Sequence, residues 1–189
     1  MASTGGPLLS LTLRPEVPMG AYQGLGYVCV LGAVEALRSQ GQELGIGWPF
    51  DLVDAETNER LAHLRVQAGY NEGMFATCEL LADKDAFNEL VSDLELVSAG
   101  IERRVDSWAE KVRAGQAVAG PLAPILSDYF DATPLLGHPA EAIYPNGNVM
   151  ASGTFAGIDI WGRATLRTEE GRELEFAPEQ ASIRVSRLP

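Results

Sequence analysis

The sequence predicts an α+β fold in which a sheet with helices is followed by a small β-barrel. The 189 residues are 46% hydrophobic and 21% charged, which suits one ordinary domain or a medium and a small one. Strand-like and helical patterns occupy the first part of the chain. From Gly137 onward, short strand-like segments are separated by turn residues, a pattern typical of a barrel of about 50 residues. The predicted domains are therefore residues 1–136 and 137–189.

The first domain begins with a strand and a long helix. Residues 8–13 alternate leucine with serine and threonine, and two prolines after them end the strand. Residues 21–40 are apolar almost all round a helix, which predicts a buried central helix. Gly41 marks its C-terminal end, and Gly32 within it allows a close approach to the sheet.

Further strands and helices complete this domain. Residues 46–53 read as a strand interrupted by Pro49, and the charged run after them reads as a turn. In the strand at residues 60–68, alternation points Ala62, Leu64 and Val66 to the core. The rest is predicted as a strand at 74–81 and helices at 84–94, 97–114 and 122–130.

The charge balance excludes several classes of partner. The net charge is −12 and no dense cluster of Lys and Arg occurs, so nucleic acid and an anionic membrane surface are not expected to bind. Cys29 and Cys78 lie in apolar runs and read as buried hydrophobic residues, and no spacing predicts a metal site. There is no signal peptide and no apolar run approaching about 20 residues, so a cytoplasmic location is expected.

Five segments, taken in order, carry a resemblance to a known family. Residues 47–51 (GWPFD) match a block close to K-W-P-N-D, and residues 60–67 (RLAHLRVQ) match K-L-A-G-I-L-V-E. Residues 3–10 (STGGPLLS) are similar to S-P-x-G-x-L-x-x-S. GPLAPILSDYF is similar to a helix that precedes a barrel, and GTFAGIDIWGRATLR to that barrel's G-x-x-x-G-I-D-x-x-G-x-L-x-L. Together these segments resemble the catalytic core and C-terminal domain of biotin–protein ligases.

The resemblance implies a fold and a chemistry. The fold is the mixed sheet with helices shared with lipoate ligases and class II tRNA synthetases, followed by an SH3-like barrel. Family members make biotinyl-AMP from biotin and ATP and pass biotin to a lysine of an acceptor domain, so biotin and ATP are the implied ligands. A Gly/Arg-rich loop would lie just before residue 3, so the chain is expected to be truncated at its N-terminus.

The charged parts of the family's site are replaced here. Gly47 stands at the lysine position, Phe50 at the asparagine and His63 at the glycine of K-L-A-G, and residues 74–81 lack a G-x-G-I-N stretch. Adenylation depends on positioned positive charge, so no catalytic residue is assigned. Trp48 either walls the pocket or belongs to the core, Asp51 is structural or faces the ligand, and His63 plugs the pocket or contacts a ligand. The predicted degenerate ligand pocket comprises Gly47, Trp48, Phe50, Asp51, Arg60, Ala62 and His63.

Three functions follow from these observations. The first is a degenerate homologue, a pseudoenzyme that does not form biotinyl-AMP alone and acts as a binding or assembly module. The second is a functional biotin–[carboxyl carrier protein] ligase whose N-terminal part is supplied by another chain or by an upstream start. The third is a lipoate- or octanoyl-transferase-like enzyme. A homodimer or a partner chain over the truncated face is expected, and a biotin-acceptor domain is a further candidate partner.

Overall fold

The computed structural model describes residues 6–83 and 85–186 of the chain. Residues 3–5, which carry part of the family resemblance, and Lys84, where a helix was predicted to begin, lie outside the described residues. The first sheet is formed by β1 (Leu9–Leu13), β2 (Leu44–Gly47), β3 (Asp51–Asp54), β4 (Arg60–Tyr70) and β5 (Met74–Ala82). The helices are the 3-10 helix η1 (Met19–Gly24), α1 (Leu25–Ser39), α2 (Asp85–Leu90), α3 (Leu94–Arg113) and α4 (Leu126–Asp131).

The first sheet is antiparallel throughout its described strands, in the order β1-β5-β4-β3-β2. The expectation of a mixed sheet is therefore wrong for this part of the chain. Short turns join β2 to β3, β3 to β4 and β4 to β5, and such connections produce antiparallel neighbours. Helix α1 links β1 to β2, but these two strands lie at opposite edges and do not pair.

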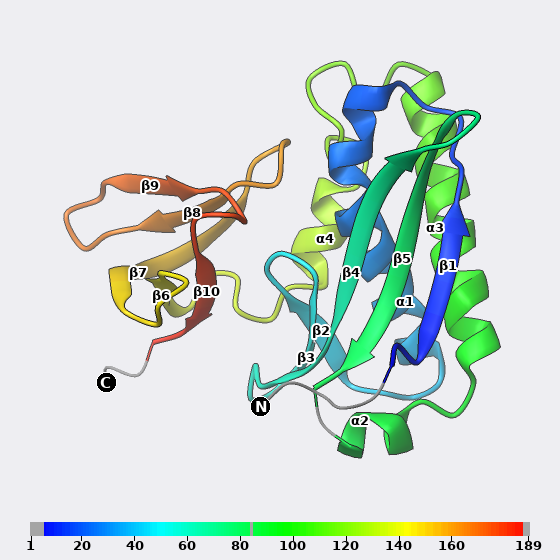
Figure 1. The fold of residues 1–189 in the computed structure, drawn as a ribbon. Coiled ribbons are helices and arrows are strands. Elements are labelled where there is room, and N and C mark those ends of the chain that lie inside the picture. Colours follow the sequence, from blue (N-terminus) through cyan, green and yellow to red (C-terminus); the bar gives the residue numbers. More distant parts are fainter. Residues whose placement is uncertain (1–5, 84, 187–189) are drawn as a thin grey trace.

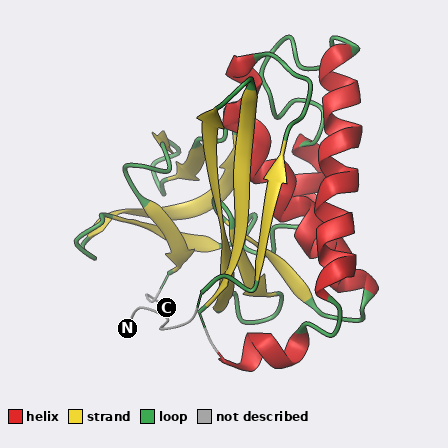
Figure 2. Ribbon diagram, turned by 45° about the vertical axis from the view of Figure 1, so that its right-hand side comes forward, coloured by secondary structure: helices red, strands yellow, loops and turns green. Residues whose placement is uncertain are grey.

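Helices α1 and α3 cover one face of this sheet, while the opposite face is turned toward the viewer in Figure 1 and carries no helix of the described chain (Figures 1 and 2). The covered face is apolar, because Leu64 pairs with Leu80 and Val66 with Cys78 on the same side. Most residues of α1 are buried, as its all-round apolar pattern predicted. Gly32 was expected to allow a close approach to the sheet, but it lies against α3, since a Cβ there would lie 2.9 Å from the Gly100 carbonyl oxygen.

The second sheet contains β6 (Pro139–Ile143), β7 (Val149–Ile158), β8 (Ala164–Arg167), β9 (Glu173–Phe176) and β10 (Ser182–Val185). Its order is β10-β6-β7-β8-β9, again antiparallel. Strands β9 and β10 form the two edges, and within the described residues no ladder joins them. The β-rich second part is confirmed, whereas closure into an SH3-like barrel is not observed. The boundary at residues 136 and 137 stays a prediction.

Backbone hydrogen bonds join the second sheet to the segment around α4 that precedes it. The Leu122 amide donates to the Ile160 carbonyl at 3.2 Å, and the Gly137 amide donates to the Phe155 carbonyl at 2.8 Å.

None of the helices over residues 6–83 and 85–186 has the length and apolar character needed to cross a membrane.

Candidate functional site

The Trp-Pro pair forms a structural corner between β2 and β3. The Trp48–Pro49 peptide bond is cis. Trp48 is only 2% exposed, and its Nε1 donates to the Gly162 carbonyl in the second sheet at 2.8 Å. The Tyr129 hydroxyl of α4 donates to the Pro49 carbonyl at 3.0 Å. Trp48 therefore belongs to the core and holds the turn between β7 (Val149–Ile158) and β8 (Ala164–Arg167).

Phe50 occupies space beside the central helix. A Cβ built on Gly26 would lie 2.6 Å from the Phe50 ring, so the ring rests directly on the α1 backbone. The ring also meets Tyr27 edge-on, with 4.8 Å between ring centroids. On its other side Phe50 lines a cavity of about 360 Å³ between η1 and the sheet, together with Val66 and Met74. The aromatic ring thus lies on the helix-covered face.

Three of the predicted site residues meet on the open face of the first sheet. The Arg60 Nη1 lies 3.8 Å from Asp51 Oδ1, and Asp51 pairs with His63 across the β3–β4 ladder. Asp83 completes the group, because its carboxylate accepts from the Arg60 Nε at 2.7 Å and lies 3.4 Å from the His63 Nδ1. We call Asp51, Arg60, His63 and Asp83 the outer-face cluster. Ala62 points the other way, into the core, and is fully buried.

The pKa of Asp51 is raised to about 7. Burial is the largest cause, the nearby Asp83 charge adds to it, and the Arg60 guanidinium opposes it. At 3.8 Å, with a guanidinium that is about half exposed, the Arg60 contact offsets burial only in part. Asp51 therefore changes its charge close to neutral pH, where it can both hold and release a proton.

His63 has one unsatisfied nitrogen within this cluster. Its Nδ1 is buried and makes no hydrogen bond, although Asp83 Oδ1 lies 3.4 Å away. That separation is too long for a well-formed hydrogen bond. The His63 imidazole thus stands on the open face of the sheet at the position where the family sequence has glycine. It takes up space there that a glycine would leave free for a ligand.

The two arginines of β4 on the open face are paired with carboxylates, whereas Arg14, just after β1, lies over the Phe75 ring at 5.2 Å from its centroid. Arg60 is shared between Asp51 and Asp83, and Arg65 Nε donates to Glu79 Oε2 at 2.7 Å. Gly47, which stands at the position of the family's lysine, lies next to Asp51 in the β2–β3 ladder. A Cβ at Gly47 would approach the Val53 Cγ1 to 2.8 Å, so a longer side chain requires Val53 to move. The arrangement offers bound anions little free positive charge.

Asp83 and Glu79 are the site residues that sequence reasoning missed. Residues of β4 and β5 pair so that Ala62 faces Ala82 and Arg65 faces Glu79, and the Asp83 amide donates to the Leu61 carbonyl at 2.9 Å. The β4–β5 hairpin turns tightly around Gly73, which has a φ of +133°. Counting outward from a turn placed there would have set Glu79 opposite Arg65 and Asp83 opposite Leu61, next to Arg60.

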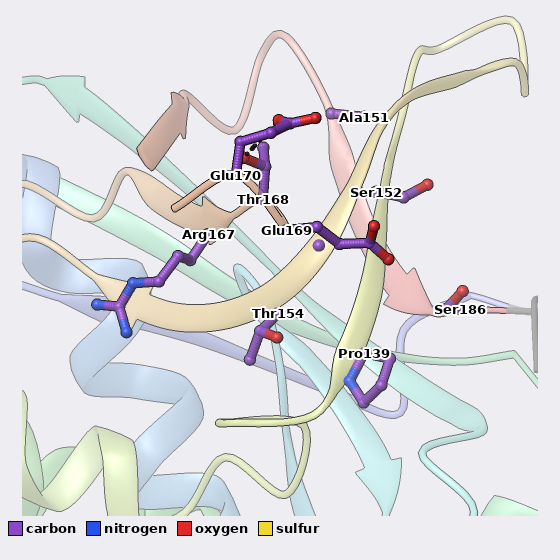
Figure 3. Close-up of a pocket in the computed structure, with 10 residues that line it drawn as sticks. Pro139, Ala151, Ser152, Thr154, Arg167, Thr168, Glu169, Glu170 and Ser186 are labelled. Carbon is purple, nitrogen blue, oxygen red and sulfur yellow. Dashed lines mark hydrogen bonds between the residues drawn. The ribbon is translucent and has the colours of Figure 1, made fainter. Parts of the chain in front are cut away.

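A larger cavity, of about 530 Å³, lies in the second sheet (Figure 3). Two of its lining residues have side-chain partners nearby: Thr168 hydrogen-bonds to Glu170 at 3.1 Å, and Arg167 binds Glu173 at 2.9 Å. In Figure 3 the Arg167 side chain points away from the other lining residues. This cavity contains none of the predicted site residues. Within the described part of the chain, no three or more His, Cys, Asp and Glu side chains gather as a metal would require.

Comparison with protein-family profiles gave no match, and no curated protein sequence matches the chain. Solved structures do match it. Biotin protein ligase from Aquifex aeolicus in complex with biotin and ATP superimposes with a TM-score of 0.65 at 16% identity, over 94% of this chain and 77% of that one. The apo structure of the same Aquifex aeolicus enzyme gives a TM-score of 0.64 at 17% identity, over 94% and 81% of the two chains. The chain therefore has the biotin protein ligase fold, as the sequence resemblance predicted.

Proposed function

We propose that the chain is a biotin protein ligase-like binding module that does not form biotinyl-AMP on its own. The observation that carries this proposal is the charge state of the open face. Arg60 and Arg65, the arginines of β4 beside the outer-face cluster, are paired with carboxylates, and Asp51 adds negative charge above about pH 7. An adenylate intermediate bears a phosphate, which such a surface does not stabilise.

Loss of a positioned charge raises the barrier to adenylation. A preorganised group that stabilises developing charge typically supplies about 3–4 kcal/mol of the barrier reduction, and its loss costs about that much. At Gly47 no side chain carries charge, and the close approach of Val53 leaves little room for one. His63 also fills surface next to Arg60. The fold is thus retained while the charges that support adenylation are not.

The same charge pattern suggests what the module binds. Asp51, Asp83 and Glu79 line one face of the sheet, and the whole chain has a net charge of −12. Such a surface attracts a partner that presents lysine. The family resemblance supplies a partner of this kind, a biotin-acceptor domain with its target lysine. We propose that the outer-face cluster contacts this domain.

Two measurements test the proposal. The purified chain is incubated with biotin and ATP, and biotinyl-AMP is sought by mass spectrometry; we expect none, and its formation by the chain alone would refute the proposal. Calorimetry then follows binding of a biotin-acceptor domain. Asp83→Asn should weaken that binding, because it removes a carboxylate of the cluster. Asp106→Asn removes an exposed charge on α3 and should leave the affinity unchanged.

One observation favours a second function. Arg60 keeps a cation where the family block K-L-A-G begins, as an active ligase completed by another chain would require. Biotinylation of an acceptor domain by a mixture with a chain that carries a Gly/Arg-rich loop, and by neither chain alone, would favour this alternative. Lipoate or octanoyl transfer has less support, because Lys111 lies on α3 and reaches the Pro124 carbonyl.

A further inference from the structure

Trp161 is the exposed tryptophan of the chain. It is 49% exposed, whereas Trp48 and Trp108 are 2% and 0% exposed. It lies in the turn between β7 and β8. The backbone of this turn is fixed by Asp159, whose Oδ1 accepts from the amides of Trp161 at 2.8 Å and Arg163 at 2.9 Å. The indole is therefore exposed from a rigid turn.

The first sheet holds the same turn from the other side. The Gly162 carbonyl accepts from the Tyr27 hydroxyl at 2.7 Å and from the Trp48 Nε1 at 2.8 Å, and both donors are buried. Gly162 has a φ of +91°, and a Cβ there would lie 2.4 Å from Tyr27, so the position requires glycine. The Trp-Pro corner thus fixes the position from which Trp161 is presented.

Trp161 borders a cavity of about 380 Å³ between η1, the end of α3 with the loop after it, and the β7–β8 turn. No charged side chain lines this cavity. The lining is mostly apolar and includes Ala21, Val112, Val118 and Pro121, and the Gln23 amide is the polar side-chain group besides the indole N–H. A volume of this size suits a small molecule and is too small for a folded partner.

We propose that this cavity binds a small, planar, uncharged molecule that stacks on Trp161 and accepts a hydrogen bond from Gln23 or the indole N–H. Leaving a tryptophan half exposed forgoes the burial of a large apolar surface, which a stacked ring recovers. Because Asp159 and Gly162 fix the turn in advance, little order is lost on binding. The absence of charge in the lining disfavours an ionised ligand, whose desolvation nothing offsets. This site is separate from the outer-face cluster.

Nuclear magnetic resonance of the three indole N–H groups tests this proposal directly. Trp161→Phe identifies the Trp161 resonance by its disappearance. The full chain is titrated with benzamide, which is planar and uncharged and has an amide acceptor. Cyclohexanecarboxamide keeps the amide but is not planar, and benzoate keeps the ring but is charged. We expect benzamide to shift the Trp161 resonance with a dissociation constant on the order of 1 mM, and the two analogues to bind at least about tenfold more weakly.

Two cavity-filling variants complete the design. Ala21→Leu places extra carbons in this cavity and should weaken benzamide binding at least about tenfold, while unchanged Trp48 and Trp108 resonances report an intact fold. Ala151→Leu fills the cavity in the second sheet, which shares no lining residue with the proposed site, and should leave benzamide binding unchanged. The proposal is overturned if no Trp161 shift occurs up to about 10 mM, if the non-planar amide binds equally well, or if Ala151→Leu weakens binding as much as Ala21→Leu. A Trp161 shift that depends on protein concentration alone would assign the surface to a second copy instead.

Discussion

Replacing Asp51 by asparagine should stabilise the protein more at alkaline than at acid pH. The pKa of Asp51 rises from 3.8 to about 7 in the folded state, mainly through burial. Between these two values the folded state binds more protons than the unfolded state, so stability falls as the pH rises through this range. A pKa difference of one between the folded and unfolded states corresponds to about 1.4 kcal/mol. The rise in the Asp51 pKa therefore sets an upper limit of about 4 kcal/mol for the cost of burying the charged carboxylate.

The measurable part of this effect is smaller. Only the part of the pH range between 5 and 7 falls between the two pH values to be compared and below the folded-state pKa of about 7. About a quarter of the Asp51 side chain also stays accessible to solvent, which screens its charge. We therefore expect the stabilisation by Asp51→Asn to grow by about 2 kcal/mol from pH 5 to pH 8. Urea unfolding followed by circular dichroism at both pH values gives the two free energies of unfolding.

Asp54→Asn is the matched control for this experiment. Hydrogen bonds from Thr57 lower the pKa of Asp54, so its contribution to stability has the opposite sign and is lost as the pH falls. Asp54→Asn should therefore destabilise the protein near neutral pH and less so in acid. If Asp51→Asn changes the free energy of unfolding equally at pH 5 and pH 8, or if the carboxyl titrates near 4, the reasoning about burial is refuted.

Three further predictions concern packing and assembly. Trp48→Phe removes one of two donors to the Gly162 carbonyl and should lower the free energy of unfolding by about 1 kcal/mol in urea; no loss would mean that the hydrogen bond contributes nothing. Gly26→Ala places a methyl group 2.6 Å from the Phe50 ring and should lower the free energy of unfolding by about 1–3 kcal/mol. Adding Phe50→Leu to the same chain should restore most of this loss, which a double-mutant cycle would measure. We propose that a second chain covers the β1 edge of the first sheet, so light scattering at micromolar concentration should give a dimer mass, and a monomer mass would contradict this.

Local patterns predicted most of the elements. The alternation in residues 60–68 gave both the strand β4 and its buried side, because side-chain direction repeats every two residues. The apolar content of residues 21–40 gave the buried α1 in the same way. Pro49 divided one predicted strand into β2 and β3, since proline lacks the N–H that a ladder requires.

Long-range arrangement was harder to predict. The outer-face cluster depends on the β4–β5 register, which brings Asp83 to Arg60 across 23 residues of sequence. Sequence reasoning grouped Ala62 with His63, although neighbouring strand residues point to opposite faces. Closure of the second sheet depends on accumulated strand twist and bending, which residue patterns do not encode.

The double hydrogen bond to Gly162 has a consequence for how the chain melts. If the second sheet detached alone, the Tyr27 hydroxyl and the Trp48 indole N–H would both lose their shared acceptor. The net loss of one hydrogen bond is about 0.5–1.5 kcal/mol, so detachment of this sheet alone is unfavourable. We therefore expect the two sheets to unfold together, in a single transition.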